Sequence, residues 1–226
     1  MGMLYEWRIR HQNDQVVLVS FNYDCLLDDA RIPFSGSPVD LDGYIAAKDF
    51  PLLKPHGSIN WFVEVAGLRR GSGSASYEYG SQTLIDAAPW DVTDKYHVIP
   101  GPEPDLFRGQ QWIAPVIAIP VEKKAGDSFA FPSSHLHYLR ETIPEVSRLL
   151  IIGWAGREDH FHNLWKGAGA KLEQLVVVAG SLTTAEDVLN NLLPQDYWKN
   201  VTRRIQFERG FSEFVEDRKR LEEMFR

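Results

Sequence analysis

Three polar side chains that could do chemistry follow two apolar segments of this chain. Residues 16–21 run into Asn22 and Asp24, and residues 52–55 run into His56. Buried strands of a parallel sheet show this pattern where they deliver groups into a crevice at their carboxyl ends. An amide, a carboxylate and an imidazole at one rim could hold a ribose and manage its hydroxyl protons. The alternative is that Asn22 and Asp24 only cap the following helix, and that His56 is a satisfied histidine in a turn.

The elements that must position these groups alternate along the chain. Short apolar runs predict strands at 16–21, 52–55, 116–119, 149–152 and 175–179. Helices are expected at 25–29, 134–147, 159–172, 184–193 and 212–224, with Thr184 as the capping residue of its helix. Strands separated by helices predict an α/β fold, specifically a doubly wound, Rossmann-like and mostly parallel sheet with a small irregular lobe inserted.

The stretch 65–111 interrupts this alternation. It is rich in glycine and serine and then in proline, so we expect neither a long helix nor a central strand there. We expect an inserted loop region within a single domain that spans 1–226. The region is either a surface excursion with a small hairpin or a lid that excludes water from the crevice.

Four phrases of the sequence, taken in order, resemble a known family. They are SFNYD at 20–24, KPHGSINW at 54–61, APVIAIPVEKK at 114–124 and LLIIGWAGREDH at 149–160. The chain is similar in these phrases to the sirtuin-like domains of the silent information regulator type, in their zinc-free bacterial branch. The family's opening strand and Gly-rich turn have no counterpart before residue 16, so we expect an N-terminally incomplete domain that alone binds NAD weakly or not at all.

The resemblance implies that NAD is the substrate and that three residues are catalytic. Asn22 would position a water molecule and hydrogen-bond the ribose. Asp24 would fix that ribose or orient Asn22, and His56 would accept a hydroxyl proton in its neutral form. The residues assigned to the cofactor are Gly57, Ser58, Gly153, Trp154, Ala155 and Asp159. Asp159 has an alternative role as a carboxylate that initiates a helix.

Without a zinc lobe or an evident acyl-lysine channel, water is the expected acceptor, which favours NAD hydrolysis to nicotinamide and ADP-ribose. In the family this activity often belongs to bacterial anti-phage defence effectors. The alternative function is a catalytically degenerate, partner-binding or regulatory module, and NAD-dependent protein deacylation ranks last. The expected partners are NAD and either a second copy of the chain or a defence-system protein.

Composition and charge narrow the classes of ligand and cellular location that the chain can have. The chain has 226 residues and a formal net charge of −7, which argues against a nucleic-acid surface. A single cysteine excludes an internal disulfide and a four-thiolate zinc site, so no metal is expected. We expect the histidine pairs 135/137 and 160/162 to be surface or rim residues. The lack of a signal-peptide pattern or a membrane-length apolar stretch predicts a cytoplasmic protein.

Overall fold

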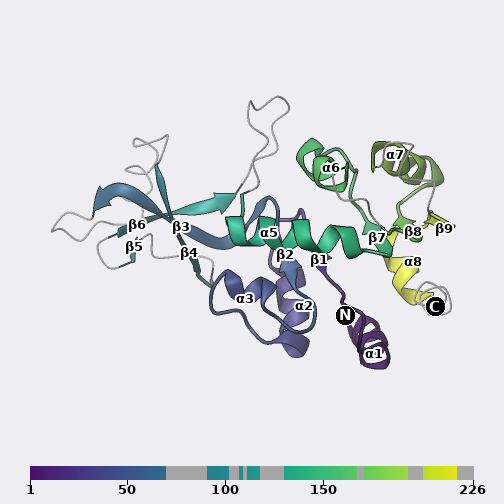
Figure 1. Ribbon diagram of the computed structural model, residues 1–226, viewed down its shortest axis with the longest axis horizontal. Coiled ribbons are helices and arrows are strands. Elements are labelled where there is room, and N and C mark those ends of the chain that lie inside the picture. Colours follow the sequence, from purple (N-terminus) through teal and green to yellow (C-terminus); the bar gives the residue numbers. More distant parts are fainter. Residues whose placement is uncertain are drawn as a thin grey trace. The chain divides into compact units, whose positions relative to one another are not determined.

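The computed structural model describes residues 1–69, 91–101, 107–108, 111–117, 130–166, 171–192 and 201–217. The chain forms two compact units, which are described separately below (Figure 1). The first unit comprises Met1–Lys124 and Phe129–Leu136. The second comprises Ala125–Ser128 and His137–Arg226.

The first unit contains a short parallel pair of strands and three helices. Strand β1 (Leu18–Val19) pairs with β2 (Leu52–Leu53), and both strands come from the apolar runs in the sequence. Its helices are α1 (Gly2–Arg10), α2 (Leu26–Ser35) and α3 (Asp42–Ile45). Helix α2 is longer than expected because it continues through Pro33 and ends at Gly36, whose φ of 76° suits a residue without a Cβ.

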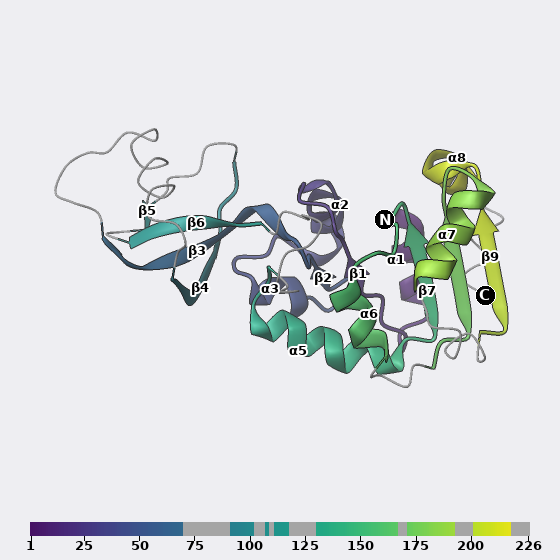
Figure 2. The same ribbon diagram turned by 90° about the horizontal axis from the view of Figure 1, so that it is seen from above.

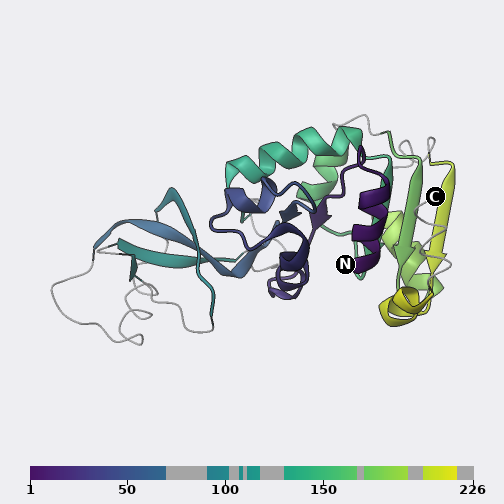
Figure 3. The same cartoon turned by 90° about the horizontal axis from the view of Figure 1, so that it is seen from below.

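The rest of the first unit is a four-stranded antiparallel sheet in the order β4-β3-β6-β5. Its strands are β3 (Gly57–Arg69), β4 (Val92–Val98), β5 (Phe107–Arg108) and β6 (Gln111–Ile117). Figure 3 shows this sheet extending away from α2 and α3. A core of aromatic and branched side chains holds it together, made up of Phe62, Val65, Ile99, Trp112, Ile113 and Ala114. The stretch 65–111 thus contributes the end of β3, the strands β4 and β5 and the start of β6. Contrary to the expectation, β3 is a central strand of this sheet. Residues 70–90, 102–106 and 109–110 lie outside the described part.

The second unit contains a three-stranded parallel sheet. Its strands are β7 (Arg148–Ile152), β8 (Gln174–Val178) and β9 (Arg203–Phe207), in the order β7-β8-β9. The expected strands 149–152 and 175–179 are confirmed by β7 and β8. Strand β9 was missed because its first residues, Arg203 and Arg204, are exposed and polar, so only the tertiary pairing with β8 identifies it.

Helices accompany this sheet. They are α6 (Asp159–Lys166), α7 (Leu182–Leu192) and α8 (Gly210–Glu216). Figure 2 shows α7 lying along the strands, and it contacts both β8 and β9. The parts of the predicted helices at 167–170, 193 and 218–224 lie outside the described residues.

The mixed α/β class is therefore confirmed, but the described strands fall into three separate sheets rather than one. The predicted strand at 116–119 is also different: residues up to Ile117 belong to β6, which is antiparallel to β3. Residues 118–124, with the lysines of the third phrase, lie outside the described residues. Within the described ranges, no helix is long and apolar enough to cross a membrane.

The cap of α7 is a correction to the sequence prediction. Ser181, not Thr184, caps the helix, because its Oγ accepts the Thr184 backbone N–H at 3.1 Å. The Ser181 carbonyl also accepts the Ala185 N–H at 3.0 Å, which starts the helical bonding pattern. The helix therefore begins about one turn earlier than predicted, and serine is among the preferred N-cap residues.

The helix predicted at 134–147 is divided by a proline. Helix α5 (Ser133–Thr142) ends before a 3-10 turn, η1 (Ile143–Glu145), because Pro144 cannot donate the hydrogen bond that would continue it. His137 is exposed, as expected, and pairs with Glu141. The expectation for His135 is wrong, because this side chain is fully buried.

His135 is held as a neutral imidazole. Its Nε2 donates to the Leu41 carbonyl at 2.7 Å, and its ring meets that of Trp61 edge-on at 5.5 Å. Its Nδ1 has no hydrogen-bond partner among the described residues. Burial lowers the pKa of His135, and the Leu41 carbonyl and Asp42 act in the opposite direction.

We expect His135 to make the protein less stable in mild acid. Its folded pKa lies below the unfolded value near 6.5, so below that pH the unfolded chain binds a proton that the folded chain does not. Stability should therefore fall as pH drops through 6.5, by up to about 1.4 kcal/mol per pH unit. Urea denaturation of wild type and His135→Gln at pH 7.5, 6.5 and 5.5 measures this slope, because glutamine keeps a donor for Leu41 but does not titrate. The exposed His137→Gln is the control, and equal slopes in wild type and His135→Gln would refute the prediction.

Candidate functional site

The parallel pairing of β1 and β2 brings the two predicted motifs to one edge. Leu18 pairs with Leu52 and Val19 with Leu53, so both strands end side by side. The Ser20 N–H continues the ladder by donating to the Leu53 carbonyl at 2.9 Å. Asn22 and His56 follow these strand ends and therefore lie at the same edge of the pair.

Asn22 is the exposed member of the site. Its backbone N–H donates to the Ser20 hydroxyl at 3.3 Å, which fixes the turn after β1. Its side chain is exposed and makes no hydrogen bond to any described residue. The carboxamide is therefore available to a ligand, and the alternative capping role for Asn22 is not seen.

Asp24 lies one residue before Cys25, the N-cap of the following helix. Its Oδ1 accepts the Leu26 backbone N–H at 3.0 Å, at the start of α2. This interaction satisfies one of the N–H groups that the first helical turn leaves unpaired. The other carboxylate oxygen, Oδ2, has no hydrogen bond within the described part of the chain. Asp24 can thus accept the first backbone N–H of α2 and still present one oxygen at the edge.

His56 is packed among aromatic rings. It is 8% exposed, and its ring meets Phe21 edge-on with centroids 5.1 Å apart. The ring of Tyr23 lies 6.2 Å away, and partial burial raises the pKa of that phenol. These contacts fix the orientation of the imidazole, as a proton-transferring group requires.

A buried lysine, which we did not predict, ties the two motifs together. Lys54 is fully buried, and its ammonium donates to the Asp24 carbonyl at 2.5 Å, the Ser58 hydroxyl at 2.6 Å and the Asp28 carboxylate at 3.0 Å. These three acceptors match the three donors of an ammonium group. The Lys54 ammonium therefore links the KPHGS phrase to the SFNYD phrase through the Asp24 carbonyl, and to α2 through the Asp28 carboxylate. The only signal in the sequence is a lysine inside an apolar segment. A lysine is almost never fully buried unless its charge is paired, so its position indicates a buried partner.

Further polar groups surround this pair. The Tyr44 hydroxyl donates to the second oxygen of Asp28 at 2.7 Å and accepts from the Asn60 amide at 3.3 Å. Burial, followed by the charge of Asp28, strongly raises the pKa of Tyr44, so it remains a neutral donor. Arg31 lies one turn after Asp28 and donates to the carbonyls of Tyr44 and Phe50. Burial lowers the pKa of its guanidinium.

Gly57 and Ser58 are committed to this internal structure. The Ser58 hydroxyl donates to the Tyr23 carbonyl at 3.2 Å and accepts from Lys54, and the residue is fully buried. Gly57 has φ of 82°, and a Cβ at this position would lie 1.8 Å from the Val116 carbonyl oxygen. The close backbone approach that Gly57 permits is therefore to strand β6 of the same chain.

The predicted cofactor residues of the second unit form a turn after β7. Gly153 has φ of 63°, and the Ala155 carbonyl accepts from the Asn191 amide at 3.0 Å. Trp154 donates from Nε1 to the Glu158 carboxylate at 2.5 Å, and that carboxylate also accepts the Arg157 backbone N–H. Asp159 is exposed and begins α6, in keeping with its alternative role as a helix-initiating carboxylate.

His162 holds this turn, contrary to the expectation of a surface histidine. It is 7% exposed, and its Nδ1 and Nε2 each lie 2.9 Å from a carbonyl oxygen, those of Leu192 and Gly156. These two contacts hold the imidazole from both sides of its ring. Its ring also stacks on Trp154, with centroids 6.2 Å apart. His162 thus connects the turn after β7 to the end of α7.

The structure therefore brings together Asn22, Asp24 and His56 in the first unit, and Gly153, Trp154, Ala155 and Asp159 in the second. Among the described residues, no group of three histidine, cysteine or acidic side chains is arranged to hold a metal ion. The chain matches no known protein-family model and no curated protein.

Proposed function

We propose that the edge after β1 and β2 binds NAD as a substrate and that the protein hydrolyses the bond between its nicotinamide and ribose. The observation that carries this proposal is the parallel pairing of Leu18 with Leu52 and Val19 with Leu53. Ligands of open α/β sheets bind beyond the carboxyl ends of parallel strands. The four sirtuin-like phrases supply the substrate class.

Each side chain at this edge has a role that its surroundings allow. The exposed carboxamide of Asn22 would hold the attacking water and a ribose hydroxyl. The free oxygen of Asp24 would accept a second ribose hydroxyl. His56, held by Phe21, would take the proton released as water attacks, and nicotinamide would leave with the bonding electron pair. Fixed dipoles at this edge would stabilise the positive charge that develops on the sugar.

The proposal has two parts that rest on the resemblance alone. One is the assignment of Gly153, Trp154, Ala155 and Asp159 to the cofactor. The other is a Rossmann-like, doubly wound sheet. An experimental structure in which β1, β2, β7 and β8 share one sheet would support the second part.

A catalytically degenerate partner-binding module is the second candidate. The observation in its favour is that Gly57 and Ser58 are taken up by the contact with β6 and by the Lys54 network, so neither is available to a cofactor. A deacylase ranks below both candidates. The two leading functions differ in whether nicotinamide is released at all.

The test is nicotinamide release from NAD, followed by chromatography, on the protein with any upstream residues that its reading frame encodes. Asn22→Ala should reduce the rate by about 100-fold or more, because removing one positioned hydrogen-bond donor costs that much in comparable sites. The exposed side chain of Asn22 makes no bond to the described residues, so this variant should keep the wild-type melting temperature. Asn13→Ala, at another exposed asparagine of the same unit, is the matched control. A wild-type protein that releases no nicotinamide would leave the partner-binding function in first place, and a fully active Asn22→Ala would remove the site.

A further inference from the structure

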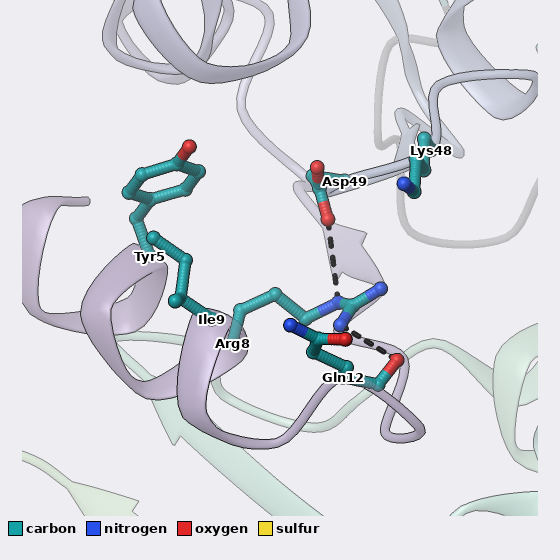
Figure 4. Close-up of a pocket in the computed structure, with 6 residues that line it drawn as sticks. All are labelled: Tyr5, Arg8, Ile9, Gln12, Lys48 and Asp49. Atoms are coloured by element: carbon teal, nitrogen blue, oxygen red, sulfur yellow. Dashed lines mark hydrogen bonds and ion pairs between the residues drawn. The ribbon is translucent and has the colours of Figure 1, made fainter.

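A second site lies in the first unit, in a pocket between α1 and the loop before β2. Tyr5, Arg8 and Ile9 of α1 line one side, Gln12 follows the helix, and Lys48 and Asp49 complete the wall (Figure 4). The pocket has a volume of about 240 Å³. That is below the range of drug-sized ligand sites, so the pocket suits a small molecule.

The guanidinium of Arg8 is fixed at the base of this pocket. Its Nε pairs with the Asp49 carboxylate at 3.3 Å, and its Nη1 donates to the carbonyls of Gln12 at 2.9 Å and His11 at 3.3 Å. The Arg8 side chain is 13% exposed. Its remaining nitrogen, Nη2, has no partner within the described ranges. A partly buried arginine with one free donor edge is suited to an oxygen anion.

The other polar groups around the pocket are mainly donors. The Lys48 ammonium, the Gln12 side-chain amide and the Tyr5 hydroxyl make no hydrogen bond or ion pair with the described residues. Two cations, Arg8 and Lys48, face a single carboxylate, Asp49, on a chain whose formal net charge is −7. This local excess of positive charge favours an anionic ligand.

The walls of the pocket are rigid. The Tyr5 ring lies 4.8 Å from Phe34 and 6.5 Å from Phe50, so its position is set by two aromatic neighbours. Phe50 follows Asp49 and has φ of 57°, a conformation that costs energy for a residue with a Cβ. Its carbonyl accepts from the buried Arg31 at 3.3 Å, and the Asp49 carbonyl accepts from the Ser35 hydroxyl. The adjacent carbonyls of Asp49 and Phe50 are therefore both held, and the strained Phe50 directly follows the lining residue Asp49.

We propose that this pocket binds a small organic anion about the size of a sugar phosphate. Its phosphate or carboxylate oxygens accept from Arg8 Nη2 and Lys48, and its body lies against Tyr5 and Ile9. Gln12 supplies a further hydrogen bond to the body. This site is separate from the edge formed by Asn22 and His56 and does not depend on the proposed hydrolysis.

The experiment is calorimetric titration of the full chain at low ionic strength with ribose 5-phosphate, citrate and inorganic phosphate. We expect saturable binding of ribose 5-phosphate or citrate at one site, and which of the two binds distinguishes phosphate from carboxylate. Lys48→Ala should weaken binding about 10-fold, because it removes one charge-assisted hydrogen bond. Lys95→Ala, at an exposed lysine of β4, is its control.

A second pair of variants differs in charge alone. Ile9 is 52% exposed, so Ile9→Glu and Ile9→Gln should both fold. The glutamate should repel the anion and abolish detectable binding, whereas the glutamine of equal size should retain it. The proposal is overturned if neither organic anion binds, or if binding is unchanged in both Lys48→Ala and Ile9→Glu. Inorganic phosphate that binds as tightly as ribose 5-phosphate would overturn the organic part of the assignment.

Discussion

Gly57→Ala should prevent the first unit from folding. A Cβ at residue 57 would lie 1.8 Å from the Val116 carbonyl oxygen and 2.7 Å from its carbonyl carbon. These are backbone atoms of β6, which pairs with β3 at this point, so no side chain can move aside to relieve the overlap. Either the β3–β6 pairing opens at Gly57, or the turn that carries His56 is displaced. We expect the first unit to lose its cooperative urea transition, which circular dichroism measures.

Gly67→Ala is the matched control for this substitution. Gly67 lies in the same strand and has φ of 76°, but no described atom lies within 4 Å of the position that a Cβ would occupy. Its replacement should therefore cost only the left-handed backbone conformation, about 1–2 kcal/mol. If the two variants were equally stable, backbone conformation and not the contact with Val116 would explain the glycine at 57.

Lys54→Met should destabilise the first unit by about 3–5 kcal/mol, because removal of one partner leaves the buried Asp28 carboxylate without its counter-charge. The Asp24 carbonyl and the Ser58 hydroxyl lose the same donor. Methionine has a similar length and adds no cavity of consequence, so the loss reports on the ion pair. Urea denaturation at pH 7 measures the free energy of unfolding.

Lys95→Met provides the comparison for an exposed pair of the same unit. The Lys95 ammonium is 3.8 Å from Glu64 and its side chain is 69% exposed, so this substitution should cost at most about 1 kcal/mol. The double variant Lys54→Met with Asp28→Leu should recover part of the stability, because no unpaired charge then remains. A Lys54→Met variant as stable as Lys95→Met would mean that the Lys54–Asp28 pair does not hold the two motifs together.

The local elements were predictable wherever a residue pattern specifies them. The apolar runs before Asn22 and before His56 predicted β1 and β2, and the run at 149–152 predicted β7. Each is a continuous apolar segment that gains stability by leaving water. Strand β9 was not predictable, because its exposed and polar first residues form a strand only by pairing with β8. The long β3 was missed although Trp61, Phe62, Val63 and Val65 are apolar and buried.

The candidate site was predicted in its members but not in its support. Asn22, Asp24 and His56 were identified by residue type and position after strands, and the pairing of β1 with β2 places two of these motifs at one edge. The sequence could not show that Lys54 and Asp28, 26 residues apart, form a buried pair. It also misplaced His135 and His162, because their hydrogen-bond partners are distant in the sequence. The Leu41 carbonyl is 94 residues from His135, and the Leu192 carbonyl is 30 residues from His162.

The sequence by itself determined the mixed α/β class, the strand ends that carry polar groups, and the chemistry those groups could perform. These properties depend on local patterns of apolar, polar and turn-forming residues. Only the tertiary structure decided that the described strands divide among three sheets, that Gly57 faces β6 and that Lys54 is buried against Asp28. Each of these outcomes depends on which distant segments come into contact. The free energy of burying a charge or of packing one backbone against another depends on the partner that the distant segment supplies.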